Sequence, residues 1–207
     1  MGFDTPASAE RIRLTMEALK ARGINAELVA TPTEALAKLL ALIPAGRSLS
    51  TGASLTLKEI GFEELLRTGA HAWKNLKAEY LAEKDPAVQL QLRKQSTLAD
   101  YYLGSVHAVA QTGEVVVASM TGSQLAPYAY GASNVIWVVG AQKITGSLEE
   151  AIRRVREHVL PHEDKRQREN TGGKMGSMIG KMLLFEREVP FLRRTVTMII
   201  VQQPVGD

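Results

Sequence analysis

The chain has 207 residues, of which 45% are hydrophobic and 23% are charged, with a net charge of +3 and no cysteine. This composition is typical of a globular protein, and the length suits one domain over residues 1–207 rather than two. Without cysteine, these residues cannot form disulfides, thiolate nucleophiles, Cys-ligated Fe–S clusters or Cys-type zinc sites. Acidic and basic residues are interspersed, so no nucleic-acid partner is predicted.

The N-terminal residues predict a cytoplasmic protein. Residues 1–6 have neither the basic nor the apolar region of a signal peptide. No apolar run approaches the roughly 20 residues that span a bilayer. We therefore expect a cytoplasmic location and no membrane partner.

The first predicted elements alternate between helix and strand. A helix is expected over residues 5–23, followed by a strand over 24–30. Thr31 and Glu34 have the spacing of a capping box. They predict the start of a second helix, which ends at Pro44.

The following segment predicts two short strands and two helices. The strands are expected at 48–51 and 70–73, and the helices at 57–67 and 85–103. The first strand leads into a loop at Gly52, before a helix begins.

The C-terminal half predicts a β-hairpin, two helices and two strands. The hairpin is expected at 105–119, the helices at 125–130 and 147–160, and the strands at 135–139 and 196–202. Pro161 is expected to stop the second of these helices. Strands that alternate with helices predict an α/β protein with a mixed, mostly parallel sheet, helices on both faces and one hairpin.

The strongest candidate site is the segment S-T-G-A-S-L-T-L-K-E-I-G, residues 50–61. A strand, a glycine turn and a helix start bring free backbone N–H groups together, which favours an anion. Gly52 permits close approach, and Ser54 and Thr56 add hydroxyl groups. The alternative is plain helix capping, with Thr56 as the N-cap and Glu59 as its partner.

Three charged residues are candidates for catalysis. Glu59 and Glu114 are carboxylates suited to acid–base chemistry, and Lys143 follows an apolar strand where it could neutralise an anion. The alternatives are an exposed turn residue for Glu114 and a solvated loop lysine for Lys143. His107 lies in an apolar strand and is interpreted as a core residue rather than a ligand.

Residues 105–144 carry a family resemblance. Their features are S-V-H-A-V-A-Q-T-G-E-V-V-V-A-S, a small-residue loop and the ending G-A-Q-K-I. This order, together with the segment 50–61, resembles the LUD domain, named for lactate utilisation. The resemblance covers 36–207 and is clearest over 100–144. It implies the fold superfamily of ribose-5-phosphate isomerases, glucosamine-6-phosphate deaminases and CoA-transferases.

The resemblance implies a component of L-lactate oxidation that acts beside Fe–S-bearing subunits. The chain has no cysteine and no flavin or nicotinamide fingerprint, so no cofactor of its own is expected and a redox centre would belong to a partner. We expect a non-redox component that binds a small anionic ligand. The alternative is an isomerase- or transferase-like enzyme acting on a sugar phosphate or acyl-CoA. Self-association into a homo-oligomer is left open.

Two further segments are candidates for contact with the ligand. The loop with Gly122 and Ser123 contains small residues, but it lacks the arginine common in relatives. Arg166 lies where relatives carry a basic residue. The surrounding segment 162–182 is interpreted either as a surface loop or as a lid. His158 and His162 have no third ligand nearby, so no metal site is predicted.

Overall fold

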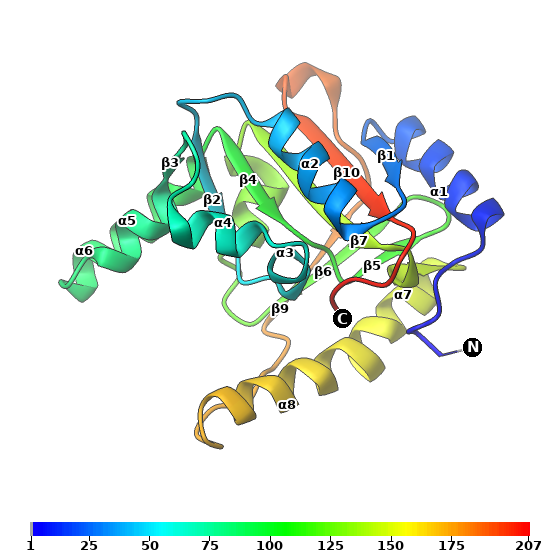
Figure 1. Cartoon of the computed structure of the whole chain (residues 1–207). Helices are drawn as coiled ribbons and strands as arrows, with labels where there is room; N and C mark the ends of the chain where they lie inside the picture. The colour runs from blue at the N-terminus through cyan, green and yellow to red at the C-terminus, as the bar shows by residue number, and fades with distance from the viewer. Residues whose placement is uncertain (1) are drawn as a thin grey trace.

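The computed structural model describes residues 2–207. Its larger sheet has six strands, all parallel, in the order β1-β10-β7-β4-β2-β3 (Figure 1). These strands are β1 (Asn25–Val29), β2 (Ser48–Thr51), β3 (Lys74–Asn75), β4 (Tyr101–Gly104), β7 (Asn134–Gly140) and β10 (Thr195–Val201). The predicted α/β class with a mostly parallel sheet is confirmed.

A second, smaller sheet contains the hairpin. Its order is β8-β5-β6-β9, and only β5 and β8 are parallel. The strands are β5 (Ala108–Ala110), β6 (Val115–Ser119), β8 (Ile144–Thr145) and β9 (Lys181–Phe185). Gly113 forms the turn with a φ of 95°, a conformation that favours glycine. The hairpin is confirmed, but it pairs with β8 and β9 and does not join the parallel sheet.

Most helices connect the strands and are capped by side chains. They are α1 (Ala9–Ala21), α2 (Pro32–Leu42), α3 (Leu55–Glu59), α4 (Phe62–Thr68), α5 (Leu76–Ala82), α6 (Pro86–Gln95), α7 (Leu148–Arg154) and α8 (Leu160–Asn170). Short helical turns occur at Ser96–Leu98, Pro127–Gly131, Ala141–Lys143, Val155–Val159 and Pro190–Leu192. The cap predicted at Thr31 is confirmed, and Ser147 caps α7 in the same way: each hydroxyl accepts the amide three residues on.

Different elements of secondary structure pack on the two faces of the parallel sheet. Leu39 of α2, Leu57 of α3 and Phe62 of α4 pack on one face, as the helices in front of the sheet in Figure 1 show. The other face packs against α1 and the small sheet, and the fully buried Trp137 of β7 belongs to this cluster, in contact with Tyr128 and Phe185. Alternation along β7 produces this division, because successive side chains of a strand point to opposite faces. The far side of the small sheet packs on α7, through Ala151 among others.

Several element boundaries differ from the prediction. The first helix begins at Ala9, because Ser8 rather than a residue near Thr5 provides the N-cap. The predicted strand at 70–73 is replaced by β3. The helix predicted over 85–103 ends at Gln95, and its last residues instead form β4 between β2 and β7. Pairing with two neighbouring strands determines that this short apolar segment is a strand and not the end of a helix.

Pro161 does not stop a helix. The chain remains helical from α7 through a π-helical turn at Val155–Val159 into α8. Pro161 lies in the first turn of α8, where the wider turn before it accommodates the missing N–H. The segment predicted as a loop over 162–182 is therefore helical up to Asn170. No helix within residues 2–207 is both long and apolar enough to cross a membrane.

Candidate functional site

A pocket of about 350 Å³ lies where the parallel strands end. The segments after β2 and β4 and Lys143 beyond β7 form one side, and Asp207 beyond β10 reaches its rim. The end of β6, helix α8 and Ser177–Ile179 enclose it from the small-sheet side. Carboxyl ends of parallel strands meet at one sheet edge, which is where α/β proteins gather ligand contacts. The pocket is therefore a candidate ligand site.

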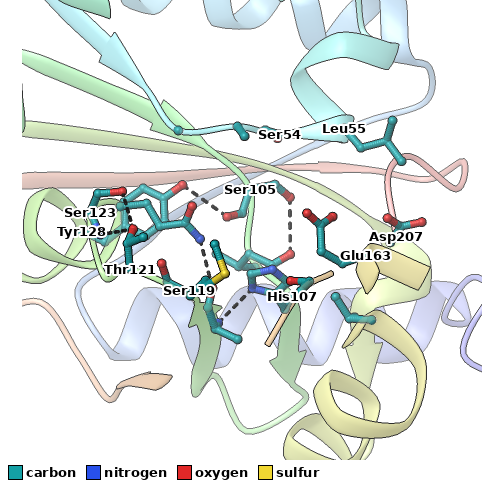
Figure 2. A pocket seen from close by; sticks show the side chains of 18 of the residues that line it. Ser54, Leu55, Ser105, His107, Ser119, Thr121, Ser123, Tyr128, Glu163 and Asp207 are labelled. Atoms are coloured by element: carbon teal, nitrogen blue, oxygen red, sulfur yellow. Dashed lines mark hydrogen bonds between the residues drawn. The ribbon is translucent and has the colours of Figure 1, made fainter. Parts of the chain in front are cut away.

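Helix capping and the pocket share the segment after β2. Ser54, rather than Thr56, is the N-cap of α3, and its hydroxyl accepts the Leu57 amide. This leaves the Thr56 hydroxyl free to bind another group. Gly52, Ser54 and Thr56 all line the pocket, and Ser54 lies at its upper edge in Figure 2. Gly52 has an ordinary backbone conformation, but a side chain there would meet Gln124 at 3.1 Å.

Lys143 is the most unusual charged residue of the pocket. Its side chain is only 3% exposed, and Nζ donates to Thr56 Oγ1 at 3.1 Å and to Ser105 Oγ at 3.3 Å. Within residues 2–207 no carboxylate lies within 4.0 Å of this amine. Burial, with a smaller contribution from the nearby charge of Arg154, lowers the pKa of Lys143 to about 7 against the opposing effect of Asp207.

His107 lines the same pocket as a neutral side chain. Its Nδ1 accepts the backbone N–H of Ala118 at 3.0 Å, shown as a dashed line in Figure 2. Burial, together with the charges of Lys143 and Arg154, lowers the pKa of His107 to about 3. The imidazole is thus neutral at physiological pH, with its proton on Nε2. The sequence interpretation as a core residue missed this position at the pocket.

The two glutamates proposed for acid–base chemistry lie outside the lining of the pocket. Glu59 is exposed at the end of α3, and its Oε2 accepts the Gly206 amide at 2.6 Å. Glu114 lies at the hairpin turn, where it pairs with Arg22 of the α1 C-cap and accepts from Thr112. The geometry at Glu114 is that of a structural ion pair between the hairpin and α1.

Other candidates differ in their access to a ligand. Ser123 lines the pocket, but the neighbouring Gly122 does not, and its amide already donates to Ser119 Oγ at 2.9 Å. Arg166 lines the pocket but is bound on both sides, by Glu163 and by Asp207 at 2.5 Å. Two carboxylates neutralise its charge, so Arg166 is poorly suited to attract an anion.

Arg93 is a cation at the pocket that the sequence interpretation did not single out. It extends from the last turn of α6 and donates to Ser123 Oγ at 3.2 Å. Among residues 2–207 it pairs with no carboxylate. In Figure 2, Ser123 and Tyr128 lie at the opposite end of the pocket from Asp207. No local motif marked Arg93, because only the packing of α6 brings it to this loop.

These features define a class of protein: an α/β protein with a small-molecule pocket at the carboxyl ends of its parallel strands. The model of the LUD domain family matches residues 12–180. The chain therefore belongs to the LUD domain family, as its sequence motifs predicted. Membership supports a role related to lactate utilisation at the level of the family.

A solved structure has the same fold. A DUF162 family protein from Deinococcus radiodurans is 16% identical and aligns with a TM-score of 0.53, over 94% of this chain and 99% of that chain. At this identity the likeness shows the fold alone. A search among curated proteins found no match.

Proposed function

We propose that this protein binds a small anionic ligand in the pocket and acts as a non-redox component of lactate utilisation. The observation that carries the proposal is Lys143, a buried amine that faces the pocket without a carboxylate partner. A buried positive charge is costly unless it is paired, so an anion in the pocket would stabilise its charged form. The family supports lactate as the relevant chemistry.

The backbone beside Lys143 also favours an anion. Ala53 and Ser54 line the pocket, and their amides donate to no acceptor within residues 2–207. Unpaired amides next to a lysine provide several donors to one carboxylate or phosphate. The anion would thus bind between the segment after β2 and Lys143.

Electron transfer in this proposal belongs to partner proteins. These 207 residues contain no cysteine and cannot ligate an Fe–S cluster through thiolates. Fe–S-bearing subunits would supply the redox centre, while this chain holds or presents the ligand. With an artificial electron acceptor, the isolated chain should therefore not oxidise lactate.

Arg93 favours a second candidate function. It adds a guanidinium group at the other end of the pocket, with no carboxylate partner within residues 2–207. A ligand with two polar ends, such as a sugar phosphate or an acyl-CoA, could contact both Arg93 and Lys143. The corresponding activity would be that of an isomerase- or transferase-like enzyme.

Calorimetric titration with L-lactate, inorganic phosphate and CoA tests the anion proposal. We expect the wild-type chain to bind at least one of them, and Lys143→Gln to weaken that binding about tenfold to a hundredfold through loss of a charge-assisted hydrogen bond. Lys58→Gln is the matched control, because Lys58 is an exposed lysine on α3 that does not line the pocket. Equal affinity in the wild type and Lys143→Gln, or no binding by the wild type, would contradict the proposal.

Arg93→Gln separates the two functions. If lactate is the ligand, this change should leave its affinity almost unchanged, because Arg93 lies at the far end of the pocket. If the ligand has two polar ends, Arg93→Gln should weaken binding by a factor similar to that of Lys143→Gln.

A further inference from the structure

Lys143 has the surroundings of a nucleophilic amine. Two neutral hydroxyls, those of Thr56 and Ser105, hold its Nζ in place, at 3.1 and 3.3 Å. Neither hydroxyl carries a charge that would lock the amine as ammonium. The lysines that react with carbonyl groups in enzymes are typically desolvated or lie beside another cation. Lys143 is almost fully buried, and its charged neighbours include Arg154.

His107 provides an uncharged donor in the same pocket. Its Nδ1 is occupied as an acceptor from Ala118, so Nε2 carries the hydrogen. Nε2 makes no hydrogen bond within residues 2–207. It is also not fully enclosed by protein atoms, so its hydrogen remains accessible. In Figure 2, Ser105 lies between the segment of Ser54 and the ring of His107. A ligand in the pocket that Lys143 and His107 both line can therefore receive a hydrogen bond from a neutral imidazole.

We propose that Lys143 forms a covalent imine with the carbonyl carbon of a small 2-oxo acid. The inference rests on the proposed function, because the carboxylate of the acid has to be bound in the same pocket. The free amides of Ala53 and Ser54 suit that carboxylate, and the His107 Nε2–H suits the oxygen of the carbonyl. A 2-oxo acid carries both groups on adjacent carbons.

The reaction is an addition followed by a dehydration. The lone pair of the neutral Nζ forms a bond to the carbonyl carbon while the C=O π bond breaks, and one of the two protons on nitrogen moves to the oxygen to give a carbinolamine. The carbinolamine then loses its hydroxyl and one proton from nitrogen as water, which leaves the imine. The net change is amine plus ketone to imine plus water, with no oxidant or reductant. The His107 N–H stabilises the charge that develops on the departing oxygen.

Reductive trapping tests the imine directly. The wild-type chain is incubated with pyruvate or glyoxylate in the presence of cyanoborohydride, and the adduct is located by peptide mass spectrometry. We expect one reduced adduct, on Lys143, with either acid. The trapping rate should reach half of its maximum near pH 7 and level off about one pH unit above that, because the pKa of Lys143 is about 7. A lysine with the ordinary value of 10.5 would continue to gain reactivity above that pH.

Three variants sharpen the test. Lys143→Arg keeps a cation but should abolish the adduct, whereas Lys58→Arg, an exposed control, should keep it. His107→Phe should slow trapping at least about tenfold while the adduct stays on Lys143, because one donor to the oxygen is lost. Circular dichroism of each variant verifies that it is folded.

The outcomes separate the imine from the anion site. If calorimetry detects binding of pyruvate or lactate but neither oxo acid gives an adduct on Lys143, the imine is excluded and the anion site stands. If neither binding nor an adduct is detected, both proposals fail. Adducts spread over exposed lysines, with no preference for Lys143, would also overturn the imine.

Discussion

At the scale of single residues, the pocket favours the neutral forms of two basic groups, Lys143 and His107. Burial lowers the pKa of both Lys143 and His107, and Arg154 acts on both in the same direction. Arg154 is itself fully buried and donates to the His107 carbonyl oxygen at 2.6 Å. Its burial beside the pocket keeps a positive charge close to Lys143, which favours the neutral amine.

Lys143 should make stability depend on pH. Its folded pKa of about 7 lies below the ordinary 10.5, so between these values the unfolded chain binds more protons and stability rises with pH. Below about 7 both states are charged, and the full cost of the buried ammonium is present. We therefore expect Lys143→Met to raise the melting temperature more at about pH 6 than at about pH 9.5.

Thermal unfolding at both pH values measures this difference. Hydrogen bonds to Thr56 and Ser105 are lost at either pH, so the comparison isolates the titration of the amine. Lys58→Met is the control at an exposed lysine, and it should change the melting temperature by the same amount at both pH values. An equal shift for Lys143→Met at both pH values would mean that its pKa is ordinary in the folded chain.

At the scale of elements, Arg22 fastens the hairpin to α1. Its guanidinium donates to the Thr112 carbonyl at 2.8 Å, pairs with Glu114, and reaches the backbone and side chain of Glu186. The Arg22 and Glu114 side chains are only 19% and 13% exposed, so this pair is shielded from water. Gly113 is required beside it, because a Cβ there would lie 2.8 Å from Arg22 Cδ.

Glu114→Gln tests the structural interpretation of this residue. We expect the free energy of unfolding to fall by about 1–3 kcal/mol, since Arg22 keeps its charge but loses a charged partner. Urea unfolding measures the loss. Affinity for the pocket ligand should be unchanged by calorimetry, because Glu114 does not line the pocket. A large loss of affinity in a variant that is fully folded would restore Glu114 as a functional candidate.

At the scale of the whole molecule, the pocket lies between the parallel sheet and the small sheet. The parallel sheet contributes the ends of its strands, and the small sheet with α8 contributes the opposite side. The segment 171–180 connects α8 to β9, and its residues Ser177–Ile179 line the pocket. Met178 is 64% exposed although it belongs to this lining. Ligand binding should therefore reduce the freedom of this connection.

Hydrogen exchange with and without the bound ligand tests that expectation. We expect the amides of 177–179 to exchange several-fold more slowly in the complex, because contact with a ligand suppresses local opening. Amides of β7 in the centre of the sheet should serve as an internal control with unchanged rates. If protection is confined to residues far from the pocket, the ligand binds elsewhere.

The sequence by itself determined the local elements and the family. Capping at Thr31 and Ser147 and the turn at Gly113 follow from interactions within a few residues, and the local apolar pattern marks the strands β7 and β10. Gly52, Ser54, Thr56, Ser123, Lys143 and Arg166 were placed near a ligand by motif, and all six line the pocket. These residues stand close to strand ends or helix starts, which local patterns mark.

Only the tertiary structure decided what depends on distant partners. The short segment of β4 is a strand because β2 and β7 pair with it. Pro161 does not end the helix, because the π-helical turn before it accommodates the residue. Asp207, 41 residues away in sequence, forms an ion pair with Arg166 and offsets its charge. The packing of α6, in contrast, places Arg93 beside Ser123 at the pocket. Burial, charge pairing and sheet membership arise from packing over the whole chain. Local sequence patterns therefore do not predict them.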